Sequence, residues 1–276
     1  MINNKVGLIG GGNIARAIGG GLLRGGMHAT DLMIAEPVPA SCDRLREELY
    51  GAMVTDDNKL VARSVQILLF AVKPQILKTV CEELAADVQQ TRPLIMSIAA
   101  GPMIDDIDAW LGGGLSVVRV MPNQPALIDQ GISALYANER TSAEHRELAE
   151  RIMTAVGHAV WLDAESKMDA VTAVSGTGPA YFYLLIDVMI ESAIRYGIDA
   201  KTARTLAVET ARGATALAAA ETESMASLIE RVRSPGGTTT AAFEYLDEAD
   251  ARGIFAIAIE KAEQRAAELA RMASEA

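Results

Sequence analysis

The sequence has little positive charge and few cysteines, and both shortages narrow what this chain of 276 residues can do. It has 25 Lys and Arg against 36 Asp and Glu, so its formal net charge is −11 and it lacks the basic surface needed to bind nucleic acid or anionic lipid. Its two cysteines, Cys42 and Cys81, have no metal or redox spacing, which argues against a disulfide framework or a zinc site. We expect ordinary thiols in a reducing compartment and no metal.

Histidine motifs and membrane-spanning runs are also missing. None of the three histidines falls in a motif, and no Ser/His/Asp or metal-ligand cluster is apparent. No segment approaches the roughly 18 apolar residues that cross a bilayer, and no secretion signal is evident. We therefore expect a cytoplasmic protein with a small-molecule partner and no nucleic-acid or membrane partner.

The first part of the chain alternates short apolar runs with helical patterns, which is typical of parallel βαβ units. A helix is predicted at 13–24, and strands are predicted at 5–9, 32–35, 65–72, 94–98, 117–120 and 132–136. The predicted fold class is α/β, with an N-terminal doubly wound Rossmann-type domain at 1–163 and an all-α C-terminal domain at 164–276.

The second part has helical spacing only, with helices predicted at 167–196, 200–220, 224–233, 239–247 and 253–272. Gly176, Gly178 and Pro179 interrupt the first of these, which indicates a kink or a close backbone approach. The apolar stretch 181–190 has to be buried on most sides. A second subunit could bury it, so we expect a homodimer through this domain.

The segment VGLIGGGNIA matches the dinucleotide fingerprint G-x-G-x-x-G/A at Gly10, Gly12 and Ala15. The first glycine makes the tight turn, the second lets the backbone approach a pyrophosphate, and the small third residue allows close packing of helix on strand. Asn13 and Ile14 then open a helix whose free N–H groups face the phosphate. A turn that needs glycine for backbone reasons alone is the alternative.

Glu36 ends the second strand, where an acidic side chain commonly binds the adenosine ribose hydroxyls. A carboxylate there would repel a 2′-phosphate, which favours NADH over NADPH, although the cofactor preference stays open. Pro37 could turn the side chain away, a solvated Glu is an alternative, and Arg16 or Arg44 could still meet a phosphate.

Further loops follow the carboxyl ends of the predicted strands, where the ligand lies in an open α/β sheet. Asn58 precedes a helix, where it would either cap that helix or reach the cofactor ribose. The remaining cofactor-binding candidates of these loops are Ala71, Val72, Lys73, Pro74, Ala99 and Ala100. Lys73 is interpreted as a phosphate neighbour or a surface charge rather than a catalytic group.

The segment MPNQPA directly follows the predicted strand at 117–120, and its two prolines stiffen the loop. Met121 and Asn123 are substrate-binding candidates there. The amide of Asn123 offers a donor and an acceptor, which would suit the nicotinamide carboxamide or the substrate. A turn-forming Asn is the alternative.

The motifs VGLIGGGNIA, AVKPQ, SIAAG, RVMPNQP, VSGTGPAYF and VRSPGGTTTAAFEYL occur in this order along the chain. Together they closely resemble pyrroline-5-carboxylate reductase over nearly the full length. The resemblance implies a dinucleotide-binding domain and a helical domain that interlocks into dimers, often assembled into rings. It also implies reduction of 1-pyrroline-5-carboxylate to L-proline by NADPH or NADH, the last step of proline biosynthesis.

The resemblance implies that the segment from Ser234 to Thr239 binds the substrate carboxylate at the start of the next helix. Thr239 matches the family's hydroxyl near the imine nitrogen and is the catalytic candidate, with the proton arriving from solvent or already on the substrate. The other substrate-binding candidates are Ser175, Gly176, Thr177, Gly178, Ser234, Pro235, Gly236, Gly237 and Thr238.

Three positions depart from the family's commonest pattern. Gln124 stands where Thr is usual, Thr177 stands where Ser is usual, and Arg231 stands where we expect a smaller polar residue. Three other functions remain open: a β-hydroxyacid dehydrogenase, a reductase of a six-membered imine, and a nucleotide sensor without turnover. The first is disfavoured because the helix that would carry its catalytic lysine reads VSGTGPAYF.

Overall fold

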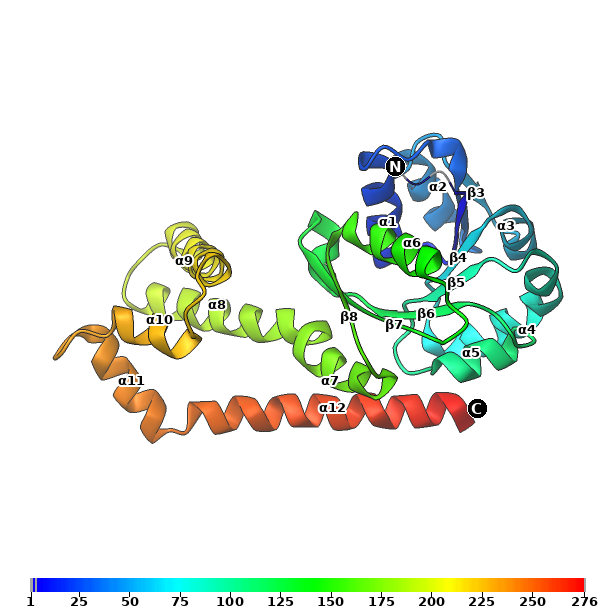
Figure 1. Ribbon diagram of the computed structural model, residues 1–276. Coiled ribbons are helices and arrows are strands. Elements are labelled where there is room, and N and C mark those ends of the chain that lie inside the picture. Colours follow the sequence, from blue (N-terminus) through cyan, green and yellow to red (C-terminus); the bar gives the residue numbers. More distant parts are fainter. Residues whose placement is uncertain (1, 3, 276) are drawn as a thin grey trace. The chain divides into compact units, whose positions relative to one another are not determined.

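A computed structural model describes residue 2 and residues 4–275 of the chain (Figure 1). Its residues group into two compact units. The sheet unit comprises Met1–Thr177 with Ala262–Ala276, and the helical unit comprises Gly178–Lys261. The predicted domain boundary between residues 163 and 164 stays a prediction.

The sheet unit is built on one eight-stranded sheet with the order β3-β2-β1-β4-β5-β6-β7-β8. Its strands are β1 (Val6–Ile9), β2 (Leu32–Ala35), β3 (Met53–Thr55), β4 (Ile67–Phe70), β5 (Leu94–Ser97), β6 (Val117–Met121), β7 (Gly131–Ala137) and β8 (Gly157–Trp161). Every neighbouring pair is parallel except β6 and β7, which are antiparallel. From β1 the chain builds outward to both sides, which confirms the doubly wound α/β fold.

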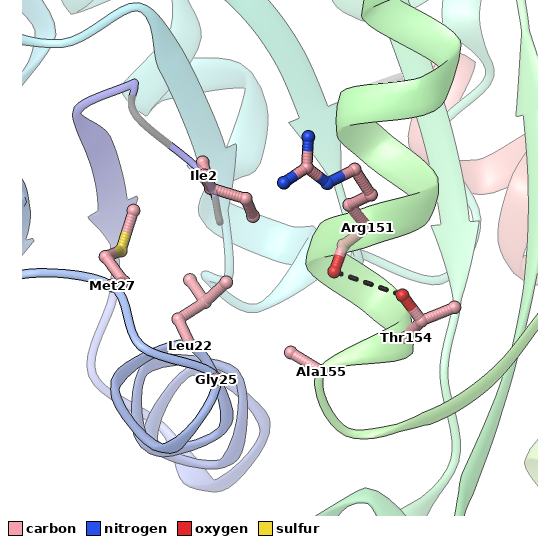
Figure 2. A pocket seen from close by; sticks show the side chains of 7 residues that line it. All are labelled: Ile2, Leu22, Gly25, Met27, Arg151, Thr154 and Ala155. Atoms are coloured by element: carbon pink, nitrogen blue, oxygen red, sulfur yellow. Dashed lines mark hydrogen bonds between the residues drawn. The ribbon is translucent and has the colours of Figure 1, made fainter.

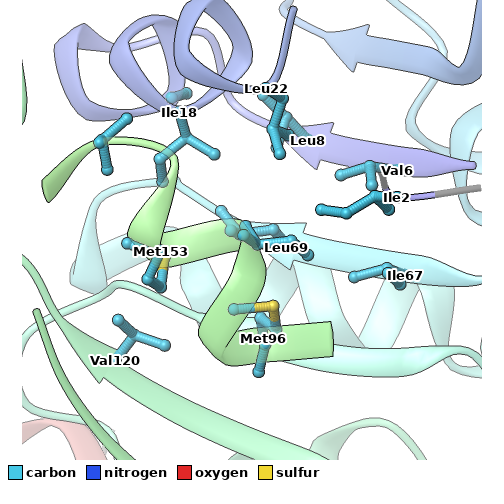
Figure 3. Close-up of a cluster of buried hydrophobic side chains, with 14 of the residues drawn as sticks. Ile2, Val6, Leu8, Ile18, Leu22, Ile67, Leu69, Met96, Val120 and Met153 are labelled. Carbon is cyan, nitrogen blue, oxygen red and sulfur yellow. The ribbon is translucent and has the colours of Figure 1, made fainter. Parts of the chain in front are cut away.

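Helices cover both faces of the sheet, and this explains the continuous apolar runs of its central strands. Along β4, Ile67 and Leu69 belong to the apolar cluster that includes side chains of α1, α2 and α6 (Figure 3). Leu68 and Phe70 belong to the second cluster, which includes side chains of α3, α4 and α5. These helices are α1 (Asn13–Arg24), α2 (Pro39–Glu48), α3 (Asn58–Ser64), α4 (Pro74–Thr91), α5 (Ile104–Trp110) and α6 (Ala143–Thr154).

All six predicted strands are present, and the sequence missed β3 and β8. β3 has only three residues, and β8 alternates half-buried with exposed residues, so neither forms the continuous apolar run that marked the others. The sequence also did not reveal that β7 runs antiparallel to β6. Their connection holds only a short 3-10 helix, Gln124–Ile128, whereas a parallel return needs a crossover of a dozen or more residues.

The predicted helices of the second half are present. They are α7 (Met168–Val171), α8 (Gly178–Arg195), α9 (Ala200–Ala220), α10 (Met225–Val232), α11 (Thr238–Glu248) and α12 (Ala251–Glu275). The predicted interruption of the first helix takes the form of a π-helix, Thr172–Gly176, between α7 and α8. An insertion of this kind frequently marks a functional site.

The helical unit leaves much of its apolar surface uncovered within one chain. Phe182, Tyr183, Leu184 and Leu185 of α8 are each 54–57% exposed. Among the described residues of this unit, the buried apolar side chains are those of Ala203 and Ala207. The predicted burial of 181–190 on most sides is therefore not achieved inside the single chain.

One helical stretch, Glu165–Arg195, is long and apolar enough to cross a membrane by length and composition alone. Its most apolar window has a mean hydropathy of 1.3 and is 11% buried. The prediction that no segment approaches such a composition is wrong by this measure. A core helix of a soluble protein passes the same test, so one such helix is weak evidence for a membrane.

Candidate active site

The loop between β1 and α1 has the geometry that a dinucleotide pyrophosphate requires. Gly10 has a φ of +99°, and a Cβ there would lie 2.9 Å from the carbonyl oxygen of Ala71. Gly12 is the N-cap of α1, and no heavy atom lies within 4 Å of the position a Cβ would take. Ala15 is buried against the sheet side of the helix. The first N–H groups of α1 thus border open space and carry partial positive charge.

Asn13 and Ile14 form the first turn of α1 and supply the first of these N–H groups. The sequence offered Arg16 as a second residue that could bind a cofactor phosphate, but its guanidinium is bound to Glu48 instead. Its Nε and Nη2 donate to the two carboxylate oxygens of Glu48 at 2.6 and 2.5 Å. A phosphate would have to compete with this bidentate pair, which weakens that alternative.

Glu36 follows β2 directly, and two main-chain N–H groups hold its carboxylate. Gly11 donates to Oε2 at 2.8 Å, and Val38 donates to Oε1 at 3.0 Å. Pro37 therefore does not turn the side chain away from the glycine loop. The negative charge is fixed at the end of β2, where the adenosine ribose lies in folds of this type.

A cavity of about 310 Å³ opens beside this position, at the carboxyl ends of β2 and β3. Its lining residues are Pro37, Pro39, Cys42, Asp43, Arg46, Val54, Thr55 and Asp56. The cavity is where an adenosine moiety held next to Glu36 would find space.

The loops after β1, β4 and β5 leave the sheet side by side. Ala71 N–H donates to the carbonyl of Ile9 at 2.8 Å, and Ile98 N–H donates to the carbonyl of Phe70 at 3.1 Å. Lys73 is exposed and is the N-cap of α4, so it is not part of a buried catalytic cluster. The other candidates here, Ala71, Val72, Pro74, Ala99 and Ala100, are buried or half-buried at the same edge of the sheet.

Asn58 does not cap α3, so that half of its predicted role is wrong. Asp57 is the cap, and its Oδ1 accepts from the N–H groups of Lys59 and Leu60 at 2.9 and 3.0 Å. Asn58 is the first residue of the helix. Asp and Asn are comparable as caps, so the sequence DN could not show which of the two would take the position. A contact between Asn58 and the cofactor ribose stays a prediction.

Asn123 is buried, and its amide joins two backbone segments. Nδ2 donates to the carbonyl of Ser175 at 3.2 Å, and Oδ1 accepts from Ile132 N–H at 3.0 Å. Nearby, a Cβ on Gly176 would lie 2.5 Å from Met121 Cε, so the methionine packs directly on the glycine. The structure thus brings together four residues that the sequence analysis proposed as substrate-binding candidates: Met121, Asn123, Ser175 and Gly176.

In the helical unit, the segment SPGGTT forms a tight turn before α11. Gly237 N–H donates to the carbonyl of Ser234 at 2.9 Å, and Gly236 has a φ of +70°. The Thr240 hydroxyl donates to the same carbonyl at 2.7 Å. The helix begins at Thr238, one residue earlier than predicted, with Gly237 as its N-cap. Its first-turn N–H groups suit a carboxylate, as expected for this turn.

Two of the positions that depart from the family pattern have a structural explanation. Arg231 Nη1 forms ion pairs with Glu221 at 3.1 Å and Glu223 at 3.3 Å, and these two carboxylates raise the pKa of the guanidinium. It therefore links the end of α9 to α10. The Thr177 hydroxyl donates to the carbonyl of Thr172 at 3.0 Å and closes the π-helix. Threonine keeps the hydroxyl that serine would supply.

The sequence analysis missed a buried ion pair behind the loops. Arg119 of β6 and Glu165 are 3.0 Å apart, and their side chains are 6% and 13% exposed. The same Glu165 oxygen accepts from Ile104 N–H at the start of α5 at 2.9 Å. The pair connects the segment before the π-helix to the sheet. A charged residue inside the apolar run VVRVM was the available signal.

Other cavities lie away from these loops. One of about 220 Å³ lies between the end of α1 and the last turn of α6 (Figure 2). Its lining residues are Ile2, Leu22, Gly25, Met27, Arg151, Thr154 and Ala155, and the Thr154 hydroxyl donates to the Arg151 carbonyl. None of the candidate site residues lines it, so we do not assign it to the site.

The sequence matches two known families. Residues 165–269 match the family described as pyrroline-5-carboxylate reductase dimerisation. Residues 5–101 match the family described as NADP oxidoreductase, coenzyme F420-dependent.

Similar proteins extend the likeness over the whole chain. The pyrroline-5-carboxylate reductase of Pseudomonas aeruginosa is 40% identical over 270 residues, which is 98% of each chain. A solved pyrroline-5-carboxylate reductase from Coxiella burnetii has a TM-score of 0.90 at 35% identity and covers 97% of this chain and 99% of its own. The Plasmodium falciparum enzyme, solved with NADP bound, has a TM-score of 0.88 at 24% identity, covering 98% and 99%.

Proposed function

The chain belongs to the pyrroline-5-carboxylate reductase family, and from this premise we propose that it reduces 1-pyrroline-5-carboxylate to L-proline with NAD(P)H, the last step of proline biosynthesis. It is an oxidoreductase. The observation that carries the proposal is the 40% identity that extends over 98% of the chain and therefore includes both the glycine loop and the SPGGTT turn.

NAD(P)H supplies the hydride, and the sheet unit has a fitting cradle for it. The open space at Gly12 and the first N–H groups of α1 suit the pyrophosphate. Glu36 suits the two ribose hydroxyls of NADH and opposes a 2′-phosphate. The nicotinamide end belongs at the loops after β4 and β5, which carry Ala71–Pro74 and Ala99–Ala100.

The SPGGTT turn would hold the substrate carboxylate at the start of α11. The N–H groups of Thr238 and Thr239 have no acceptor inside the helix, and the helix dipole favours an anion there. The Thr239 hydroxyl would hydrogen-bond the imine nitrogen. Hydride adds to the imine carbon, the C=N electron pair moves to nitrogen, and nitrogen ends with a proton taken from solvent or already bound. Catalysis by the protein is then positioning and electrostatics.

The residues around the π-helix would form the floor of the substrate pocket. The missing side chain of Gly176 leaves room for Met121, whose Cε would lie 2.5 Å from a Cβ at this position. Ser175, Thr177 and Gly178 complete this floor in the proposal. A larger side chain at Gly176 would displace Met121 and reshape the pocket.

The helical unit would form a homodimer interface. The four half-exposed apolar residues of α8 lie within residues 165–269, the range that matches the dimerisation family. A second copy packed on this surface would bury the side chains of 181–190 that are exposed in the single chain. It would also account for the apolar composition of this helix without a membrane. A ring of dimers is the further assembly that we propose. Light scattering that gives a monomer mass at all concentrations would contradict both, and the predicted cytoplasmic location stays a prediction.

The first experiment follows the loss of NAD(P)H absorbance when purified protein meets 1-pyrroline-5-carboxylate. Parallel reactions with NADH and NADPH rank the two cofactors, and a six-membered cyclic imine carboxylate tests ring size. Turnover of the five-membered ring is the expected result. No turnover by folded protein that binds nucleotide would favour a sensor, and faster turnover of the larger ring would reassign the substrate.

A further inference from the structure

Asn123 makes a long-range connection that its neighbours in the sequence do not account for. Its side chain is 9% exposed and lies just after β6. It bonds on one side to Ile132 N–H of β7 and on the other to the carbonyl of Ser175, 52 residues away in the chain. Both ends of the amide are therefore engaged by backbone.

The partner on the far side is the π-helix Thr172–Gly176, a rare element that occurs mostly as a single turn within α-helices and frequently at functional sites. Its defining hydrogen bond runs from Thr177 N–H to the carbonyl of Thr172 at 2.8 Å. One extra residue is accommodated in this turn, so Ser175 and Gly176 occupy positions that a regular helix would not give them. Asn123 supplies a side-chain bond that holds the turn to the sheet.

We propose that Asn123 is a positioning residue for imine reduction: it fixes the π-helix Thr172–Gly176 against the sheet and thereby sets the floor of the substrate pocket. The inference rests on the proposed function. It assigns Asn123 an indirect part in substrate binding, in place of a direct contact with the nicotinamide or the substrate.

The indirect role follows from what a direct contact would cost. If the amide turned toward a ligand, the half-buried carbonyl of Ser175 would lose the Nδ2 donor of Asn123, and Ile132 N–H would lose the Oδ1 acceptor. Leaving such groups unpaired is more unfavourable than the gain from a typical new hydrogen bond.

Asn138 offers a matched control in the same unit. Its Nδ2 donates to the carbonyl of Leu115 at 3.0 Å, and its Oδ1 accepts from Val117 N–H at 3.3 Å. It thus joins the start of β6 to the segment after β7 through one donated and one accepted backbone bond, as Asn123 does at the other end of the strand, and its Oδ1 also accepts from the Thr141 hydroxyl at 2.8 Å. Asn→Asp at either position keeps the acceptor and replaces the donor with an oxygen that repels the carbonyl.

The experiment compares Asn123→Asp with Asn138→Asp by amide hydrogen exchange and by steady-state kinetics. For Asn123→Asp we expect exchange in residues 172–178 to accelerate by about ten-fold or more and kcat/KM for the imine to fall by about ten-fold or more. The Kd for NAD(P)H should stay within about two-fold. Asn138→Asp should lose thermal stability yet keep exchange in 172–178 and kcat/KM within about two-fold. Asn123→Ser, without the added charge, should show the same pattern more weakly.

Each contrary result has a separate meaning. Unchanged exchange in 172–178 of both Asn123 variants would show that Asn123 does not hold the π-helix, whatever the reaction. Faster exchange with unchanged kcat/KM would remove it from the imine site. A Kd for NAD(P)H that rises as much as KM would make it a direct cofactor ligand. Failure of the proposed function appears differently, as wild-type protein without turnover, and would overturn the imine half of the inference alone.

Discussion

Two glycines of one loop should respond to the same substitution in opposite ways. Gly10→Ala places a methyl group on a residue with φ of +99°, 2.9 Å from the carbonyl oxygen of Ala71. Gly12→Ala places one in open space on a residue with φ of −67°, which any amino acid adopts. The first substitution should disturb the fold and the second should disturb only the bound cofactor.

The magnitudes follow from these environments. For Gly10→Ala, an unfavourable φ and an overpacked contact together lower the free energy of unfolding by roughly 2–4 kcal/mol. For Gly12→Ala, a slightly poorer N-cap and a less flexible unfolded chain nearly cancel, which leaves a change of about 0.5 kcal/mol or less. The methyl group would keep the pyrophosphate from one or two N–H groups of α1, so the Kd for NAD(P)H should rise roughly 10- to 100-fold.

Thermal unfolding of the proteins without cofactor measures the change in stability. Titration followed by NADH fluorescence measures the Kd for the cofactor. Gly12→Ala should unfold at the same temperature as the wild type but bind NAD(P)H more weakly. Gly10→Ala should unfold at a lower temperature than the wild type. If Gly12→Ala binds NADH and NADPH like the wild type, the pyrophosphate does not approach this loop. If Gly12→Ala unfolds at as low a temperature as Gly10→Ala, the added methyl group is crowded in the folded state and the space beside Gly12 is not open.

Three further predictions concern the cofactor, the substrate and a buried thiol. Glu36→Gln should raise the NADPH to NADH ratio of kcat/KM by about ten-fold, since it removes roughly 1 kcal/mol or more of repulsion from a 2′-phosphate; an unchanged ratio would place the ribose elsewhere. Thr239→Ala should cost about 1–3 kcal/mol in kcat/KM for the imine with the melting temperature unchanged, and wild-type kinetics would remove the hydroxyl from the reaction. Burial raises the pKa of the Cys81 thiol from 9.0 to about 12, so the folded state binds this proton more tightly than the unfolded state. The stability that this shift contributes is fully present below pH 9.0 and is lost as the pH rises toward 12. In alkaline denaturation curves, the unfolding free energy of Cys81→Ala should therefore fall less over this pH range than that of the wild type.

Much of this fold was determined by short segments of sequence. The apolar run before Gly10, the glycine pattern and the helix that follows predicted β1, α1 and the loop between them, because strand burial and glycine turns depend on neighbouring residues. The bounds of α1, β2 and α9 agree with the prediction to the residue. The SPGGTT segment likewise indicated a turn before a helix through its own composition.

Tertiary structure alone decided how these pieces meet. The Glu36 carboxylate accepts a hydrogen bond from Gly11 N–H, 25 residues away in the sequence. Arg119 pairs with Glu165 over a separation of 46 residues, and Asn123 bonds to Ser175 over 52. No local propensity encodes such pairs, because each depends on the order and direction of strands in the sheet. The antiparallel return of β7 brings Ile132 to Asn123, and no local sequence pattern indicated that direction. Sequence thus identified the residue types of the site, and the sheet determined which of them can touch.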